Sequence, residues 1–242
     1  MHRPALLGVA AICLAAWGVA AAVAQEPTDL NVTLIERTPR YNYDAAKNNP
    51  APGDTVTFHG HIKNWGFTTH PVVEYRWQID GATVEEGTLT NMVGGEARIV
   101  TRQWVWETGN HTVTLTVDPR NLIAERSELN NEITDRINGI IAGFWVEQSV
   151  YNHFRANQWR LAGVGSNSWE DWIQRQMRKH NQLCAAAIWP NSPEGVLDRV
   201  RIDKIVVVPD GALPLNGGLP TNHPDRNDKT VDLMWGFPAT LL

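Results

Sequence analysis

Cysteine is scarce in this sequence, with two residues, Cys13 and Cys184, among 242. Cys13 lies inside an apolar run near the amino terminus, so one thiol remains if that run is removed. A lone cysteine cannot form an intramolecular disulfide, and a hydrophobic core must then provide the stability. The sequence therefore excludes the class of small secreted domains that are held together by disulfides.

Charge of one sign and long apolar runs are also lacking. The formal net charge is -5 and no basic block occurs, which argues against nucleic acid or an anionic membrane surface as a partner. Beyond the amino-terminal run, no stretch approaches the roughly 18 apolar residues that a membrane helix requires. We expect no membrane span in the mature chain.

Catalytic motifs are missing as well. The sequence has no H-E-x-x-H, no G-x-S-x-G and no glycine loop of the phosphate-binding type. Carboxylate pairs such as Glu85-Glu86 are adjacent in sequence, and neighbours on a strand point to opposite faces. We predict no catalytic residue, which favours a protein that is not an enzyme.

The amino terminus indicates export. A short basic start at Arg3 is followed by an apolar run from Ala5 to Ala24, which ends in a small-x-small pattern. This pattern is typical of a signal peptide cleaved before Gln25. We therefore predict that residues 1–24 are a signal peptide and that the protein is secreted, extracellular or attached to the cell surface. The alternative is a membrane anchor.

Residues 25–138 have the alternation of β-strands. Val56, Phe58 and Ile62 alternate with polar residues, and similar short runs recur about every ten residues. Asp80-Gly81 predicts a hairpin, because both central positions of a type I′ turn need positive φ. Seven such strands predict an immunoglobulin-like antiparallel β-sandwich, with Trp77 in its core and no disulfide beside it.

Residues 139–242 have a different pattern and predict a smaller α/β segment. We expect a helix over 144–158 and a second helix that begins at Asn167 or Ser168. A buried strand is expected over 200–208 and a short strand over 231–237. The fold class is thus mainly β, with the α/β segment following the sandwich. Whether this segment is complete is left open.

The stretch from Val117 to Ile133, VDPRNLIAERSELNNEI, is dense in acids and asparagines. A calcium loop of the EF type would need an oxygen ligand at the third position and glycine at the sixth. Counted from Asp118, these positions hold Arg120 and Ile123. The stretch is better interpreted as a corner in which Asp and Asn side chains bond to nearby backbone.

Two other places could hold a metal ion. Asp210, Asp225, Asn227 and Asp228 crowd oxygen ligands around a long loop and form a calcium candidate. The alternative is ordinary turn chemistry. His59 and His61 share one face of a predicted strand and could meet Glu74, although a solvated surface is the commoner role of such histidines. Calcium is therefore possible, and no other cofactor is predicted.

Tryptophan is abundant, with 11 residues. Trp77, Trp169 and Trp172 fall at core-facing positions of the predicted elements. Trp65 follows the end of a predicted strand, so we expect it to be exposed and take it as a candidate ligand-binding residue. An exposed tryptophan could stack on a sugar ring.

Several motifs of the first part resemble a known family. Their order is D-L-x-V from Asp29, P-G-D-x-V-x-F from Pro52, N-W-G from Asn64, then G-x-H-T-V, V-D-P-x-N-x-I-x-E and E-x-N-N, ending at Asn131. This pattern, over residues 29–137, is similar to the CARDB domain, a bacterial cell-adhesion-related immunoglobulin-like module. The resemblance implies a non-catalytic module and no universal ligand residues.

Residues 144–242 faintly resemble the amino-terminal lobe of a zincin metallopeptidase. An amphipathic helix, a strand, a loop and an edge strand follow one another in this order. The zinc motif of that family is missing from the sequence, so the resemblance implies that any catalytic half would lie outside this chain.

The function that we expect is non-catalytic adhesion or scaffolding, with a cell-surface protein or glycan as partner. The alternatives are the amino-terminal portion of a secreted zinc metallopeptidase and a carbohydrate-binding module. No oligomeric state is predicted.

Overall fold

The computed structural model describes most of the chain after the predicted signal peptide. The described ranges are residues 28–38, 50–137, 140–161, 168–187, 200–213, 231 and 233–241. The predicted signal peptide, residues 1–24, lies outside these ranges. No helix among the described residues is long and apolar enough to cross a membrane.

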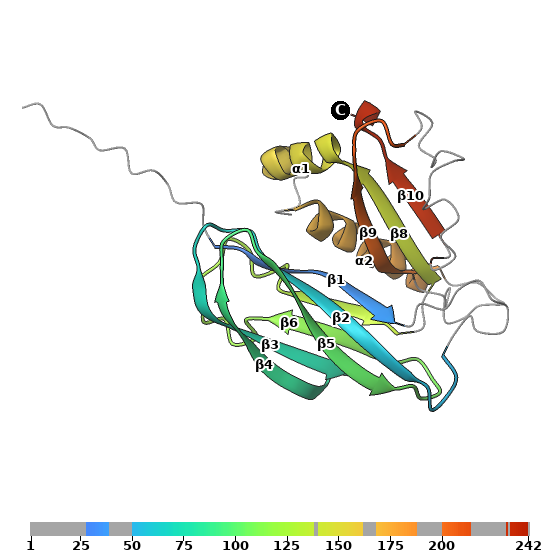
Figure 1. Ribbon diagram of the computed structural model, residues 1–242. Helices are drawn as coiled ribbons and strands as arrows, with labels where there is room; N and C mark the ends of the chain where they lie inside the picture. Colours follow the sequence, from blue (N-terminus) through green and yellow to red (C-terminus); the bar gives the residue numbers. More distant parts are fainter. Residues whose placement is uncertain are drawn as a thin grey trace, which may run out of the picture.

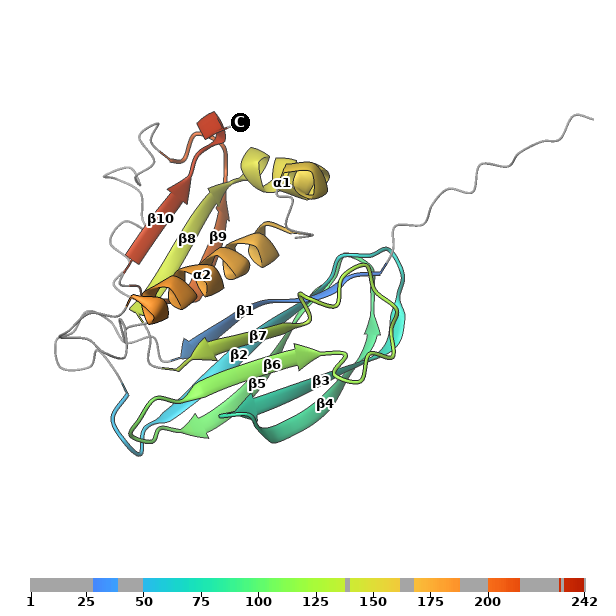
Figure 2. The ribbon, with the colours of Figure 1, turned by 180° about the vertical axis from the view of Figure 1, so that it is seen from behind.

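The first seven strands form two antiparallel sheets that face one another (Figures 1 and 2). One sheet has the order β1-β2-β5 and the other has the order β4-β3-β6-β7. The strands are β1 (Leu30–Thr38), β2 (Thr55–Asn64), β3 (His70–Ile79), β4 (Ala82–Met92), β5 (Ala97–Val105), β6 (Thr112–Val117) and β7 (Glu132–Arg136). This arrangement confirms the predicted antiparallel β-sandwich.

The sandwich core follows from the alternation of the sequence. Along β2, every second side chain from Val56 to Asn64 is buried, as expected for a strand with one face on a core. Trp77 is fully buried, as predicted, and Phe58 lies beside it with ring centroids 6.5 Å apart. Gly60 faces the same tryptophan, and an added Cβ there would meet Trp77 and Leu115.

The predicted hairpin at Asp80-Gly81 joins β3 to β4. The φ angles are 50° at Asp80 and 78° at Gly81, which are the positive values that a type I′ turn requires. The local sequence signal was therefore sufficient to place this turn.

The second part contains a parallel three-stranded sheet with the order β10-β8-β9. Its elements are β8 (Ile140–Glu147), α1 (Gln148–Leu161), α2 (Trp169–Ala186), β9 (Val200–Val208), β10 (Leu233–Phe237) and the 3-10 helix η2 (Ala239–Leu241). Residues of α1 and α2 pack on one face around Phe144, whereas Trp145 and Leu213 pack on the other face. The predicted α/β segment is confirmed.

One helix boundary was predicted wrongly. Residues 144–147 belong to the strand β8, and α1 begins only at Gln148. The strand is buried on both faces, so it lacks the alternation that identifies a half-buried strand. The start of α2 matches its prediction, because the Ser168 hydroxyl accepts a hydrogen bond from the Asp171 backbone N–H at 3.0 Å.

The two parts meet along β1. In both views α2 and β9 lie beside β1 (Figures 1 and 2), and Leu34 of β1 packs in the hydrophobic cluster of the α/β segment. The division of the chain into two domains between residues 138 and 139 remains a prediction.

Candidate functional site

The stretch 117–133 folds as a corner between β6 and β7. Asp118 and Asn121 have φ angles of 44° and 53°, a left-handed conformation that Asp and Asn tolerate better than most residues. The Asp118 carboxylate accepts hydrogen bonds from the backbone N–H groups of Leu122 at 3.0 Å and Ile123 at 2.7 Å. These contacts fit the interpretation of the stretch as a structural corner.

The second half of the corner binds β1. Glu125 accepts hydrogen bonds from the Leu30 backbone N–H and from the Asn131 amide, the latter at 3.0 Å. Asn130 donates to the Asp29 carboxylate at 3.0 Å. Burial raises the pKa of Glu125 to about 8, although both of its hydrogen bonds favour the charged form.

The calcium candidate is described in part. Asp225, Asn227 and Asp228 lie outside the described residues. The Asp210 carboxylate accepts a hydrogen bond from the Ser149 backbone N–H at 2.9 Å, so it caps the first turn of α1. A calcium site formed by these four residues remains a prediction. Within the described ranges, no group of three or more His, Cys, Asp or Glu side chains could hold a metal ion.

Trp65 is not exposed as the sequence suggested. It is 6% exposed, its backbone N–H donates to the Asp29 carbonyl at 2.8 Å, and the Lys63 ammonium lies 3.7 Å from the centroid of its ring. The prediction of exposure was wrong because the end of β2 is folded against the start of β1. A ligand-binding role for Trp65 remains a prediction. Its burial weakens that prediction, because a buried ring cannot stack on a ligand.

His59 and His61 do not meet Glu74. The histidines lie on β2, whereas Glu74 lies on β3 of the opposite sheet and forms an ion pair with Arg120. His61 is instead 3.6 Å from Glu36, and His59 shares a hydrogen bond with Thr38 at 2.7 Å.

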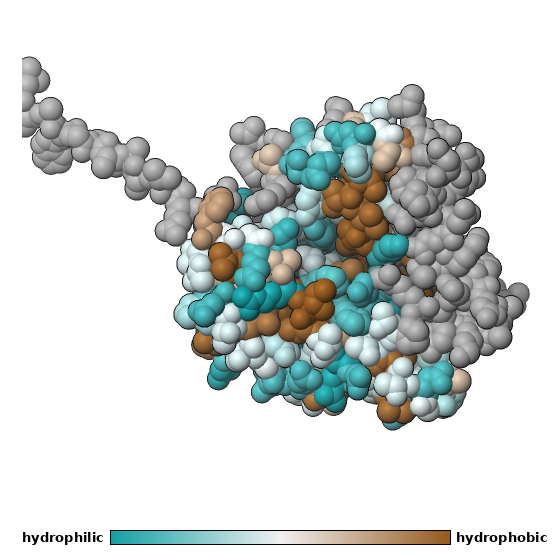
Figure 3. Space-filling view, in the orientation of Figure 1, coloured by the Kyte–Doolittle hydropathy of each residue, from teal (hydrophilic) through white to brown (hydrophobic). Residues whose placement is uncertain are grey.

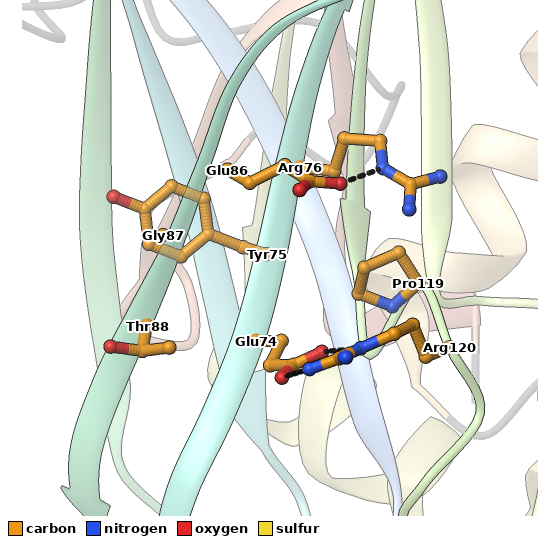
Figure 4. A pocket seen from close by; sticks show the side chains of 8 residues that line it. All are labelled: Glu74, Tyr75, Arg76, Glu86, Gly87, Thr88, Pro119 and Arg120. Atoms are coloured by element: carbon orange, nitrogen blue, oxygen red, sulfur yellow. Dashed lines mark hydrogen bonds and ion pairs between the residues drawn. The ribbon is translucent and has the colours of Figure 1, made fainter.

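A shallow depression of about 260 Å³ lies on β3 and β4, with Pro119 and Arg120 of the corner at its side (Figure 4). Two ion pairs line it side by side: Arg76 with Glu86 at 2.8 Å, and Arg120 with Glu74. Pro119 and Thr88 complete its wall. This depression could not be predicted from the sequence, since it is formed by strands and a corner that are distant in the chain.

The polar groups of this depression are balanced in charge. Its two arginines cancel its two glutamates, and Tyr75 and Thr88 add hydroxyl groups to the lining. Arg120 and Glu86 are each 62% exposed, so both can exchange hydrogen bonds with a polar surface. A partner surface that offers both donors and acceptors fits this arrangement.

The outer edge of β1 is the second notable site. An edge strand leaves backbone N–H and C=O groups unpaired unless something covers them. Here the α/β segment covers them with side chains: Asp203 accepts from the Arg37 N–H at 2.9 Å, and Gln174 donates to the Thr33 carbonyl at 3.2 Å. Arg201 donates to the Ile35 carbonyl at 3.3 Å. We call this contact the junction.

A bulge in β9 aims Asp203 at β1. Ala142 pairs with Ile202 and Gly143 with Lys204, so Asp203 has no partner on β8, and such an extra residue redirects the side chain. Arg201 donates to Asp203 and, like Arg37, to the Ile137 carbonyl. The sequence signal for this site is the three charged residues, Arg201, Asp203 and Lys204, at the start of the apolar strand β9.

Comparison with protein families adds one match. The family model CARDB matches residues 28–135, the same residues that form the sandwich. Residues 28–135 form a CARDB domain. The CARDB domain here contains the corner, the depression and β1, while the α/β segment lies outside the matched residues. A comparison with curated proteins finds no match.

Solved structures of CARDB domains are similar to this part of the chain. The CARDB domain of the PF1109 protein from Pyrococcus furiosus, solved in complex with di-metal ions, is 22% identical, with a TM-score of 0.37, and the match covers 46% of this chain and 93% of that one. A domain from Methanosarcina acetivorans, provisionally described as part of a cell-surface protein, is 24% identical, with a TM-score of 0.34 and coverage of 46% and 89%.

Proposed function

We propose that this protein is a secreted or cell-surface, non-catalytic scaffolding and adhesion protein, in which the CARDB domain carries the α/β segment in one orientation. The junction is the observation that supports this proposal. Side chains of α2 and β9 form hydrogen bonds with backbone N–H and C=O groups of β1. Separating the two parts would therefore leave these buried polar groups without partners. A connection of this kind presents the α/β segment rigidly.

The depression of Figure 4 is the surface that we assign to the partner. It lies on β3 and β4, on the sheet opposite to β1 of the junction, so both contacts can exist together. A cell-surface protein or glycan would exchange hydrogen bonds with the exposed guanidinium and carboxylate groups.

The test has two steps. First, an antibody to the protein locates it in culture medium, on intact cells and in lysed cells of the source organism. Second, beads coated with the full mature chain are scored for binding to those cells, with the double variant Glu86→Ala/Arg120→Ala compared with the unchanged chain. We expect surface or medium location, and at least a several-fold loss of bead binding in the variant.

The matched control is Glu96→Ala/Arg98→Ala. Glu96 and Arg98 form a similar ion pair at 2.7 Å beside the start of β5, and neither residue lines the depression. Equal loss of binding in both double variants would show that the depression has no special role. Confinement of the protein to the cytoplasm would contradict the whole proposal.

Two other functions each have one supporting observation. The parallel sheet with two helices on one face fits the amino-terminal portion of a secreted zinc metallopeptidase, and zinc analysis of the native product from the source organism would test it. Trp235 is 40% exposed and stacks on Phe144, which is the feature that favours carbohydrate binding. Quenching of tryptophan fluorescence by polysaccharides would test that function.

A further inference from the structure

The junction gathers charged groups from four elements at a place that is largely shielded from water. Arg201 and Asp203 of β9 are 1% and 0% exposed. On β1, the Ile35 carbonyl accepts a hydrogen bond from Arg201, and the Arg37 backbone N–H donates to Asp203. Asp135 of β7 interacts electrostatically with Arg201, with Asp203 and with Arg178 of α2. β6 is hydrogen-bonded to β7 in the sheet. It contains no charged residue, so it adds no charge to this cluster.

Asp135 is the carboxylate of this cluster that has an unpartnered oxygen. Its Oδ2 atom is buried and has no hydrogen-bond partner. The other carboxylate, Asp203, accepts hydrogen bonds from the Arg37 backbone and from Arg201. A buried carboxylate oxygen without a donor is costly while it is charged. Protonation removes that charge.

We propose that the junction is a proton-sensitive latch, which holds the α/β segment against the CARDB domain more tightly in acid than near neutral pH. The latch consists of Arg37, Asp135, Arg201 and Asp203. It goes beyond the proposed function, because it concerns the strength of an internal contact and requires no partner.

The direction follows from proton linkage. Burial, aided by the nearby Asp203 charge, raises the pKa of Asp135 to about 6, against the opposing effect of Arg201 and Arg178. With the parts separated, water would return the pKa toward the ordinary 3.8 of the aspartate side chain. The latched form then binds more protons between these values, so docking strengthens as the pH falls, by up to about 100-fold.

A second acid at the same junction acts in the same direction. Glu170 of α2 lines a cavity of about 380 Å³ between β9 and the strands β1 and β2. The Tyr151 hydroxyl donates to its Oε1 at 2.7 Å, whereas its buried Oε2 has no hydrogen-bond partner. Burial raises the pKa of Glu170.

Hydrogen exchange at Arg37 reports on the latch directly, because its backbone N–H donates to Asp203 across the junction. Exchange of the full mature chain would be followed by mass spectrometry at pH 5 and pH 7.5, corrected for the intrinsic effect of pH on exchange. We expect the protection of peptides containing Arg37 to rise by about 10-fold at pH 5 relative to peptides from β3 and β4, which the junction does not cover.

Asp135→Asn should remove most of this pH dependence. Glu132→Gln is the control, since Glu132 is an exposed acid on the same strand. Equal pH dependence in Asp135→Asn and in the unchanged chain would overturn the proposal. If Asp135→Asn does not fold, titration of the Asp135 carboxyl carbon by NMR in the unchanged chain decides: a midpoint near 6 supports the latch, and a midpoint near 4 overturns it.

Discussion

At the scale of single residues, Glu125 has a side chain that the corner needs as a hydrogen-bond acceptor but whose negative charge is unfavourable where it is buried. Its carboxylate joins the corner to the first residue of β1, a role that needs a hydrogen-bond acceptor at that point. The same position withdraws it from water and places it near Glu128 and Asp29, both of which also raise its pKa. The acceptor is needed, but its charge is unfavourable.

This conflict predicts a pH dependence of stability. The folded-state pKa of Glu125 is about 8 against an ordinary value of 4.5, so the folded chain holds a proton that the unfolded chain releases. The free energy of unfolding should therefore decrease as the pH rises from 5 to 8, by about 2–4 kcal/mol from this group. Urea denaturation at pH 5, 6.5 and 8 measures it.

Glu125→Gln keeps an acceptor oxygen and removes the titration. We expect the variant to lose most of that decrease, while Glu132→Gln, a change at an exposed acid, should retain it. A slope that is the same in all three proteins would show that Glu125 does not titrate in this range.

At the scale of elements, the contact between β2 and the opposite sheet depends on a missing side chain. A Cβ at Gly60 would meet Trp77 atoms at 2.8 Å and would overlap with Leu115 more severely. Both neighbours are fully buried, so they have little room to move.

Gly60→Ala should destabilise the fold by about 1–3 kcal/mol through overpacking, as measured by urea denaturation. Leu115→Val shortens the side chain by one methylene and removes the Cδ2 atom at the point of overlap. The double variant should therefore lose less stability than the sum of the two single variants. Simple additivity would mean that Gly60 is not packed against Leu115.

The same elements show what a sequence can predict. Strands such as β2 have one buried face, so their alternation revealed both their type and the sandwich. The strand β8 is buried on both faces, and its apolar run was mistaken in part for a helix. Burial of Trp65 escaped prediction because it depends on β1 lying beside the end of β2.

The candidate sites also differ in how far they could be predicted, because some depend on contacts between nearby residues and others on contacts between distant ones. The corner could be predicted because Asp118 and its neighbours bond within a few residues. The junction could not, since Arg37 and Asp203 are 166 residues apart in sequence. The charges within β9 were visible, but nothing in the sequence indicated which strand they would cover. The depression likewise depends on the approach of distant segments.

At the scale of the whole molecule, Arg201 connects three groups at the junction. It is 1% exposed and donates to the carbonyls of Ile35 and Ile137 and to Asp203. The two parts of the chain thus share one buried guanidinium.

Arg201→Ala should reduce the free energy of unfolding by about 3–5 kcal/mol, because it leaves a buried carboxylate without its countercharge. Arg98→Ala removes a half-buried ion pair with Glu96 and hydrogen bonds to the carbonyls of Thr90 and Asn91. It should cost less, about 1–2 kcal/mol, because no buried carboxylate loses its countercharge. Urea denaturation provides the values, and limited proteolysis shows whether cleavage between the two parts becomes faster. Equal small losses would mean that the junction contributes little to stability.

The junction also has a consequence for the order of events during synthesis. The chain leaves the ribosome from its amino terminus, so β1 is made long before Asp203 and Arg201 exist to cover its edge. All strands of the CARDB domain are complete at Arg136, yet the edge of β1 stays open until β9 has been made. During that interval, an open strand can pair with another chain. Aggregation should therefore be most probable for nascent or truncated chains that end before residue 203.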